Sequence, residues 1–424
     1  MSNSQVSTST AATQASAHHV QYDVVIVGGG AAGSGVAASL RKRNRALTIA
    51  IIEPSDKHYY QPAWTLVGAG EFKVANSVRK MADCIPKGVT WLKAQAIAFN
   101  PEHNTVTTDT LGEIRYQQLI VATGLKLNWD AIEGLADTLG HHGVTSNYRY
   151  DLAPYTWQLV QQLKTGTALF TQPPMPIKCA GAPQKAMYLS CSHWEQQNVL
   201  PNIRVNFNTA GAVLFGVKDY VEPLMRYVKR YQADLSFNST LVKVDGPNKT
   251  AWFNVKDADG NVSQVSKPFD MLHVVPPQTP PDVIKQSALA NADGWVEVNQ
   301  HTLQHVRYPH VFSLGDIAST PNAKTVAAVR KQVLIVAENL LALRGGRDFP
   351  ERYDGYGSCP LTVEKGKIIL AEFGYGGKLV PTFAWDSTVP RRSAWLLKKY
   401  LLPVVYWRLM LKGREWLARC GACG

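Results

Sequence analysis

The chain has 424 residues, which is more than one hydrophobic core normally supports, so two or more domains are expected. Hydrophobic residues make up 45% and charged residues 18%, which is typical of a folded globular protein and excludes a largely disordered one. The formal net charge is +12. Six cysteines in so long a chain exclude a small scaffold held together by disulfides, so each cysteine is a separate candidate for chemistry.

The N-terminal segment, residues 1–20, is rich in Ser, Thr, Ala and Gln and contains no Lys, Arg, Asp or Glu. A secretory signal needs a basic start and an apolar core, and a mitochondrial transit peptide needs arginines. We therefore expect a disordered tail over residues 1–20. No run of 18 uninterrupted apolar residues occurs, so we expect no helix that spans a bilayer.

Order is expected to begin at Tyr22 with a wholly apolar strand over residues 23–27, followed by a glycine-rich turn, a helix through Leu40 and a second strand over residues 48–53. This pattern is one βαβ unit. Further short apolar runs predict strands at residues 118–121, 168–170, 212–215 and 311–314. The sequence therefore predicts an α/β fold with two lobes and a C-terminal segment.

The turn after the first strand has the spacing Gly28-x-Gly30-x-x-Gly33, and Glu53 lies twenty residues beyond the last glycine. Glycines there let the backbone approach a pyrophosphate at the helix N-terminus, and the carboxylate accepts hydrogen bonds from a ribose. Glycine-rich turns alone are common. Because the strand, the helix and the acid are all in place, the pattern predicts a dinucleotide site.

Two later motifs indicate which dinucleotide binds. Thr123-Gly124 closes one apolar strand and Gly315-Asp316 closes another. This order of motifs resembles the flavoproteins of the glutathione-reductase superfamily, which contain two Rossmann-like domains. The resemblance implies FAD rather than NAD at the first site, with Asp316 at the ribityl chain. Asp316 by itself could equally be a turn or helix-capping residue.

The second lobe lacks the second glycine motif that relatives dependent on pyridine nucleotides carry. Its strand leads instead into residues 173–185, which contain several prolines and Cys179. Proline has no N–H and a fixed φ, so this loop cannot hold a pyrophosphate in the usual way. We therefore expect an electron donor other than NAD(P)H.

Several segments resemble the sulfide:quinone oxidoreductases: residues 178–185, 353–361, 60–70, 271–277 and 406–407. The resemblance extends over residues 22–412. It is to the branch with two working cysteines, which includes the mitochondrial enzymes. Other branches have a third cysteine soon after the Thr123-Gly124 strand, and residues 125–130 contain none here.

The resemblance implies that Cys179 and Cys359 form a redox-active pair beside the flavin. Sulfide would attack a disulfide or sulfur-bridged pair, leaving a persulfide on Cys179 and a thiolate on Cys359 that interacts with the flavin. Lys178 and Lys185 flank Cys179, and a nearby cation lowers the pKa of a thiol. The alternative for each cysteine alone is that of a small buried apolar residue. We give Cys84, Cys191 and the Cys420/Cys423 pair no chemical role and expect no metal site.

The resemblance also implies further contacts. The cofactor residues that we predict are Gly28, Gly30, Ala31, Ala32, Gly33, Glu53, Gln61, Ala96, Thr123, Gly124, Gly315, Asp316, Lys324 and Thr325. The quinone contacts that we predict, from position and aromatic character, are Tyr375, Phe383 and Trp385. The predicted partners are sulfide, a sulfur acceptor and a membrane quinone, with no nucleic acid; the oligomeric state is left open.

The C-terminal end combines aromatic, aliphatic and basic residues. Residues 390–424 hold eight Lys or Arg against one acid, Glu415, and residues 393–418 are dense in Trp, Tyr, Leu and Val, with Pro403 expected to divide them into two helices. Such a segment suits the boundary of an anionic lipid membrane. The alternative is a helix pair packed on the protein's own core. We expect a peripheral membrane protein, on a face of the membrane that the sequence leaves open.

The predicted domains are a disordered tail (1–20), an FAD-binding domain (21–125 and 296–350), a second Rossmann-like domain carrying Cys179 (126–295), and a quinone and membrane segment carrying Cys359 (351–424). The predicted activity is that of a sulfide:quinone oxidoreductase. An NADH:quinone oxidoreductase of the same fold is the main alternative. A flavocytochrome sulfide dehydrogenase and a sulfur carrier without turnover are weaker ones.

Overall fold

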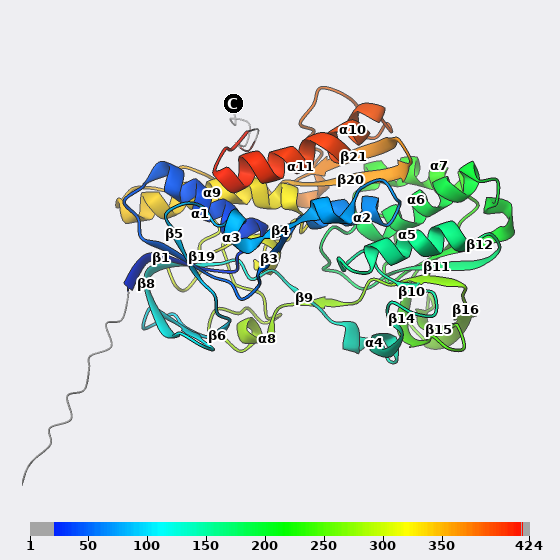
Figure 1. Ribbon diagram of the computed structural model, residues 1–424, viewed down its shortest axis with the longest axis horizontal. Helices are drawn as coiled ribbons and strands as arrows, with labels where there is room; N and C mark the ends of the chain where they lie inside the picture. Colours follow the sequence, from blue (N-terminus) through cyan, green and yellow to red (C-terminus); the bar gives the residue numbers. More distant parts are fainter. Residues whose placement is uncertain (1–20, 417, 419–424) are drawn as a thin grey trace, which may run out of the picture.

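The computed structural model describes residues 21–416 and 418 of the chain. The predicted disordered tail and the Cys420/Cys423 pair lie outside the described residues. Within them the molecule has two lobes, one built on a mixed and largely parallel sheet and one on a parallel sheet, with the C-terminal helical segment lying across both on one face (Figure 1). The predicted α/β architecture is confirmed.

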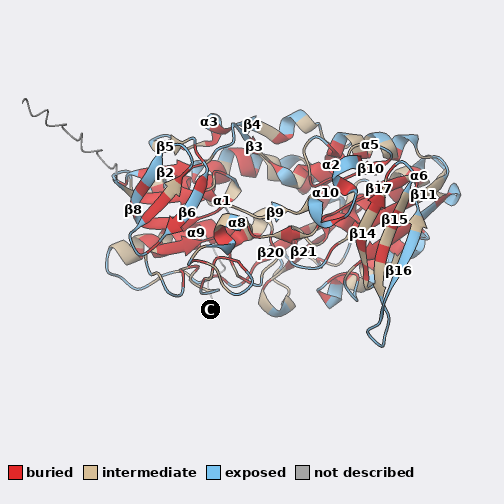
Figure 2. Ribbon diagram, turned by 90° about the horizontal axis from the view of Figure 1, so that it is seen from below, coloured by how far each residue is buried: buried red, intermediate tan, exposed pale blue. Residues whose placement is uncertain are grey.

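The first lobe is built on a seven-stranded sheet in the order β5-β2-β1-β8-β7-β6, with β19 also paired to β8. The strands β1, β2, β5, β8 and β19 run parallel. The apolar residues of the central strands β1 and β2 and of the end of β8 are buried on both faces, as in a sheet covered by helices (Figure 2). Helix α9 packs against α1 on one face. The bounds are β1 Gln21–Val27, α1 Ala31–Arg43, β2 Ile49–Ile52, β5 Val89–Leu92, β6 Ala96–Asn100, β7 Thr105–Thr108, β8 Gly112–Val121, β19 Val311–Ser313 and α9 Val326–Arg344.

The second lobe has a five-stranded parallel sheet in the order β10-β17-β11-β12-β13, beside a three-stranded antiparallel sheet, β14-β15-β16. The bounds are β10 Val144–Thr145, α5 Ala153–Gln162, β11 Gly166–Gln172, α6 Ala182–Gln196, β12 Ile203–Thr209, α7 Val221–Arg230, β13 Asp234–Ser236, β14 Ser239–Asp245, β15 Thr250–Lys256, β16 Val262–Pro268 and β17 Met271–His273. The strands of the large sheet in the first lobe thus lie within residues 21–121 and 311–313, and those of the parallel sheet in the second lobe lie within residues 144–273. The domain boundaries stay a prediction.

An antiparallel hairpin follows α9 and reaches the second lobe, where β20 packs against α6. The C-terminal segment comes next and packs against β21 and α1. The bounds are β20 Gly357–Glu364, β21 Lys367–Phe373, α10 Arg392–Leu396 and α11 Leu402–Val404; the short elements elsewhere are β3 Lys57–Tyr59, α2 Trp64–Val67, β4 Val78–Lys80, α3 Met81–Cys84, β9 Lys126–Leu127, α4 Leu135–Thr138, β18 Gln278–Thr279 and α8 Asp282–Lys285.

Two expectations about local structure were wrong. Residues 212–215 form bends after β12 instead of a strand. Leu214 and Phe215 are buried in the core of the second lobe, which accounts for their apolar character without a strand. The Leu214 carbonyl oxygen accepts a hydrogen bond from the Gln184 side chain and not from a neighbouring strand. Pro403 does not divide the C-terminal helix, because α10 and α11 are joined and continued by π-helical turns over 397–401 and 405–409. Such wide turns accommodate a missing hydrogen-bond donor.

Candidate active site

A cavity of about 500 Å³ lies where four segments meet. They are the glycine turn (residues 28–33), the loop before α6 that carries Cys179 (residues 173–181, the cysteine loop), the start of α9 and the C-terminal segment. Most of the predicted cofactor residues line it: Gly28, Gly30, Ala31, Ala32, Glu53, Gln61, Thr123, Gly124, Gly315, Asp316, Lys324 and Thr325. Two others do not line it. Gly33 lies against the glycine turn, where a Cβ would be 1.8 Å from the Gly28 carbonyl oxygen, and Ala96 is buried at the start of β6.

The glycine turn has the geometry that a dinucleotide requires. Gly28 has φ of +106°, and a Cβ there would lie 2.3 Å from the Ala122 carbonyl oxygen, so only glycine fits. A Cβ on Gly30 would meet no atom within 4 Å, and α1 begins without a side-chain cap. Its first backbone N–H groups are therefore available to an anion. The Glu53 carboxylate is held at the rim by the N–H of Gly29 (2.7 Å) and of Ser55 (2.8 Å).

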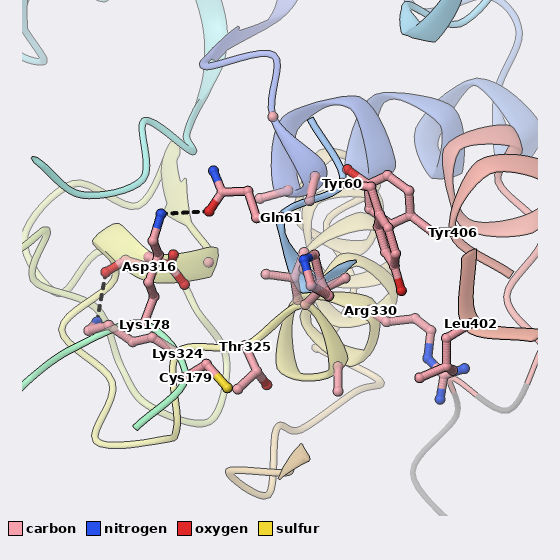
Figure 3. Close-up of a pocket in the computed structure, with 18 of the residues that line it drawn as sticks. Tyr60, Gln61, Lys178, Cys179, Asp316, Lys324, Thr325, Arg330, Leu402 and Tyr406 are labelled. Atoms are coloured by element: carbon pink, nitrogen blue, oxygen red, sulfur yellow. Dashed lines mark hydrogen bonds between the residues drawn. The ribbon is translucent and has the colours of Figure 1, made fainter. Parts of the chain in front are cut away.

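Opposite the glycine turn, the charged residues Lys178, Asp316 and Lys324 line the cavity (Figure 3). Burial raises the pKa of Asp316, against the effect of Lys324 and Lys178. The Lys324 ammonium donates to the Asp316 carbonyl oxygen at 2.7 Å, and burial lowers its pKa to about 8. The Lys178 ammonium donates to Gln61 Oε1 at 2.6 Å, and burial also lowers its pKa to about 8. Polar groups and N–H donors on two sides suit an elongated phosphate-bearing cofactor.

One of the two predicted sulfur atoms, that of Cys179, lies at the cavity wall, and the other lies directly behind it. Cys179 Sγ and Cys359 Sγ are 3.4 Å apart although the residues are 180 positions apart in the chain, and neither forms a disulfide. Cys179 precedes α6 and lines the cavity, while Cys359 lies in β20, which packs on α6. The fold therefore brings these two cysteines together as the resemblance implied.

Close approach of the sulfurs depends on the cysteine loop. A Cβ on Gly181 would lie 2.6 Å from Cys359 Sγ and 2.3 Å from Leu361 Cδ2, so a larger residue would displace β20. Cys179 itself has φ of +51°, a conformation that residues other than glycine adopt at some energetic cost. Its N–H donates to the Lys324 carbonyl at 2.8 Å, which ties the loop to the segment before α9.

The sulfur pair is arranged to hold one negative charge. The Cys359 thiol donates to Cys179, which lowers the pKa of Cys179 well below its ordinary value, and the Lys185 ammonium, 3.1 Å from Cys179 Sγ, lowers it further. The same hydrogen bond and burial raise the pKa of Cys359. Lys185 is only 2% exposed; burial opposes its charge, and the two sulfurs raise its pKa. The pair is thus poised as a thiolate on Cys179 beside a thiol on Cys359.

The C-terminal segment closes the opposite side of the cavity, where Leu402 and Tyr406 lie (Figure 3). Of the predicted quinone contacts, Phe383 lines the cavity, and Trp385 stacks on it with ring centroids 4.5 Å apart. Tyr375 does not line the cavity, and its hydroxyl donates to the Gln300 carbonyl oxygen at 2.7 Å.

A hydrogen bond anchors the C-terminal segment to the dinucleotide site. His58 Nε2 lies 2.6 Å from the Tyr406 hydroxyl, and His58 Nδ1 lies 3.1 Å from the Gly29 carbonyl oxygen. Burial lowers the pKa of His58 to about 4, so the ring is neutral near pH 7. One neutral imidazole therefore connects the glycine turn to the wall of the cavity.

Comparisons with known proteins agree with this geometry. The family model "Pyridine nucleotide-disulphide oxidoreductase" matches residues 22–160. A mitochondrial sulfide:quinone oxidoreductase of Dictyostelium discoideum is 44% identical, over 92% of this chain and 86% of the relative, and one of Mus musculus is 39% identical, over 92% and 87%. The chain belongs to the sulfide:quinone oxidoreductase family. It is a flavoprotein by that membership.

The crystal structure of the sulfide:quinone oxidoreductase from Aquifex aeolicus matches this fold with a TM-score of 0.76, at 20% identity and over 92% of each chain. At that identity the match shows the fold alone.

The sequence did not lead us to Lys398 or Tyr148, two cavity residues of this sulfide:quinone oxidoreductase homologue. Lys398 is 6% exposed, and burial, followed by the charge of Lys185, lowers its pKa to about 7. We had placed the basic residues of this segment at the lipid, but Lys398 shares the buried helical face of Trp395 and Val405. The helical spacing of these three positions could have indicated from the sequence that Lys398 is buried. The Tyr148 hydroxyl donates to the Lys178 carbonyl oxygen at 2.9 Å, which no motif indicated.

Proposed function

We propose that this protein oxidises sulfide at the Cys179–Cys359 pair and passes the electrons through FAD to a membrane quinone. The observation that carries the proposal is the contact of the two sulfurs, 3.4 Å apart beside the buried Lys185, at the wall of a cavity with a dinucleotide-binding turn. The names of its relatives support the same substrates.

FAD is the flavin that the cavity suits. An isoalloxazine alone would need no glycine turn, whereas an adenine dinucleotide places a pyrophosphate at the start of α1 and a ribose at Glu53. Asp316, Lys324 and Thr325 would lie along the remainder of the cofactor, near the start of α9. When bound, FAD supplies a two-electron acceptor for the reduced sulfurs and a two-electron donor to the quinone.

The protein's own residues begin the reaction. Hydrosulfide attacks the oxidised Cys179–Cys359 disulfide, a new S–S bond forms at Cys179, and the old bond breaks to leave Cys359 as a thiolate. Lys185, buried next to both sulfurs, stabilises the negative charge that the step creates. The buried Lys398 adds a second positive field on the pair. The sulfane sulfur on Cys179 then leaves to an acceptor.

The alternative donor, NADH, is disfavoured by the second lobe. The residues after β11 carry Pro173, Pro174 and Pro176 in place of a glycine turn, and proline offers no N–H to a pyrophosphate. The space in front of α6 is occupied by the cysteine loop. The same fold therefore lacks a second dinucleotide site in the segment where one would be expected.

Membrane docking by the C-terminal segment is the second part of the proposal. No helix in the described part of the chain is long and apolar enough to cross a bilayer. The segment instead exposes a row of large apolar side chains next to the quinone side of the cavity: Leu396, Tyr400, Leu401, Val404 and Trp416. Insertion of these side chains, with the basic residues at anionic headgroups, would open the cavity toward lipid.

Steady-state reduction of a short-chain ubiquinone analogue tests the activity. We expect sulfide, with sulfite or glutathione as sulfur acceptor, to support reduction and NADH to support none. The variant C191S is a matched control, because Cys191 is buried in α6 away from the cavity lining, and it should retain activity. Reduction with NADH, and none with sulfide, would overturn the proposal.

A further inference from the structure

A buried carboxylate lines the quinone side of the cavity, and the proposed sulfur chemistry does not use it. Glu372, near the end of β21, is 2% exposed. Its Oε1 accepts from the Tyr356 hydroxyl and from the Thr382 hydroxyl, both at 2.5 Å, and its Oε2 accepts from the Thr382 N–H at 3.0 Å. Burying a carboxylate is costly, and a purely structural need could be met by an amide. The site therefore suggests a task for an acid.

Charged and titratable groups face Glu372 from several elements. Arg330, from α9, interacts electrostatically with Glu372 and lines the same cavity. The Tyr220 hydroxyl, from the turn before α7, accepts from the Glu372 N–H at 3.2 Å. The ammonium of Lys331 lies 4.2 Å from the centre of the Tyr356 ring. Burial and Glu372 together raise the pKa of Tyr356, so that phenol stays protonated and only donates.

Thr382 connects the carboxylate to solvent. Thr382 is exposed and also lines the cavity, and its hydroxyl both reaches Glu372 and can accept from water. The next residue, Phe383, lines the cavity where we predict the quinone ring. Glu372 therefore faces the cavity, and the Thr382 hydroxyl connects its carboxylate to water.

We propose that Glu372 is the proton donor to the quinone, with the Thr382 hydroxyl as its link to water. The inference rests on the proposed function. A quinone becomes a quinol by gaining two electrons and two protons. Bound FAD, once reduced, would supply two electrons and one proton to the quinone. Glu372 would take up a proton from water through the Thr382 hydroxyl and pass it to a quinone oxygen as the second proton, which returns Glu372 to the carboxylate that accepts from Tyr356 and Thr382.

The two half-reactions of E372Q test this role separately. The amide keeps the size of the side chain and can still accept from Tyr356 and Thr382, but it cannot give up a proton at neutral pH. We expect anaerobic reduction of the flavin by sulfide to proceed at the wild-type rate. Reoxidation by decylubiquinone should slow by at least about 100-fold, the lower end of what general acid catalysis contributes. E364Q is the matched control, because Glu364 is a buried carboxylate that binds Arg230 and Lys367 away from the cavity lining.

Two further readouts separate proton donation from a structural effect. Binding of a non-reducible quinone analogue, followed by quenching of protein fluorescence, should be unchanged in E372Q. Formate, a small acid that can enter the cavity, should restore part of the reoxidation rate of E372Q and leave that of wild type unchanged. T382V should show a smaller slowing of reoxidation, with a larger solvent deuterium isotope effect than wild type.

The outcomes are distinct. Wild-type reoxidation in E372Q, or slow reoxidation that is explained by lost analogue binding and not rescued by formate, would overturn the role of Glu372 while leaving the proposed function intact. A wild-type flavin that sulfide does not reduce would instead overturn the proposed function. If E372Q failed to fold, wild-type reoxidation and isotope effect in T382V would by themselves refute the relay.

Discussion

At the scale of single residues, the reactivity of the site depends on where one negative charge resides. Lys185 is buried in α6 and donates to Cys179 Sγ at 3.1 Å, while Cys359 shares its proton with the same sulfur. Thiolate is the reactive form, and its fraction near pH 7 follows the pKa of the thiol. A buried cation this close is worth more than a surface ion pair, because water screens it little.

Replacing the ammonium should make Cys179 less acidic. In K185M the stem and its packing are retained, but the positive charge that lowers the pKa of Cys179 is lost, so the pKa of Cys179 should rise. The midpoint of the pH profile for alkylation by iodoacetamide measures this shift, with C179S giving the background from other thiols. K164M, in which a lysine outside the cavity lining is changed, should alkylate like wild type. An unshifted midpoint in K185M would show that Lys185 does not lower the pKa of Cys179.

The sequence predicted many of these residues but not their partners. Gly28, Glu53, Cys179, Lys185 and Cys359 were placed by motif or resemblance, and all but Cys359 line the cavity directly. Glu372 was missed because its hydrogen-bond partners come from other segments, so no local pattern marks it. Lys398 was missed because we placed the basic residues of its segment at the lipid. The role of each predicted site residue stays a prediction until it is measured.

At the scale of elements, the C-terminal segment has two faces with different tasks. Its buried face carries Trp395, Lys398 and Tyr406 into the protein, and its other face exposes Leu401 and Val404. Its composition led to a correct expectation of helix, but Pro403 misled us about its continuity, because π-helical turns are not visible in the pattern of residue types.

The double variant L401D/V404D tests the exposed face as a lipid-binding surface. Each apolar side chain that enters lipid contributes about 1.5–3 kcal/mol, so binding to vesicles of phosphatidylcholine and phosphatidylglycerol should weaken by at least about tenfold. Flavin content should not change. The control V262D/V265D alters two exposed valines of β16, in the antiparallel sheet of the second lobe, and should bind vesicles normally. Equal vesicle binding by both variants would assign this face another role.

At the scale of the whole molecule, two α/β lobes bring together two cysteines that are 180 positions apart in the chain. The strands and glycine turns of the first lobe were predictable from local patterns. The contact between Cys179 and Cys359 was not, because it depends on β20 and β21 crossing to pack on α6 after α9 has returned to the first lobe. Only the family resemblance indicated that contact before the structure showed it.

Two buried neutral histidines make folding stability depend on pH across the whole molecule. Burial lowers the pKa of both His58 and His273 from 6.5 to about 4, and His273 Nε2 accepts from the Asn147 N–H at 3.0 Å, which requires an unprotonated nitrogen. The unfolded chain binds these protons at higher pH than the folded protein does. Stability is therefore full above pH 6.5 and falls as the pH decreases toward 4, by about 2 kcal/mol for each histidine near pH 5.

Urea denaturation at about pH 7 and about pH 5 measures this loss. H273Q keeps an acceptor for Asn147 and removes one titrating group, so it should lose less stability between the two pH values than wild type. H103Q changes an exposed histidine and should behave as wild type. An equal pH dependence in wild type and H273Q would contradict the assignment of His273.

The central claim, that sulfide delivers electrons to a flavin through Cys179 and Cys359, is tested most directly by anaerobic titration of the purified flavoprotein with sulfide while the flavin absorbance is recorded. We expect bleaching or a long-wavelength charge-transfer band in wild type, and neither in C179S or C359S, each with its flavin still bound. Flavin reduction by sulfide in either variant at the wild-type rate would contradict the claim.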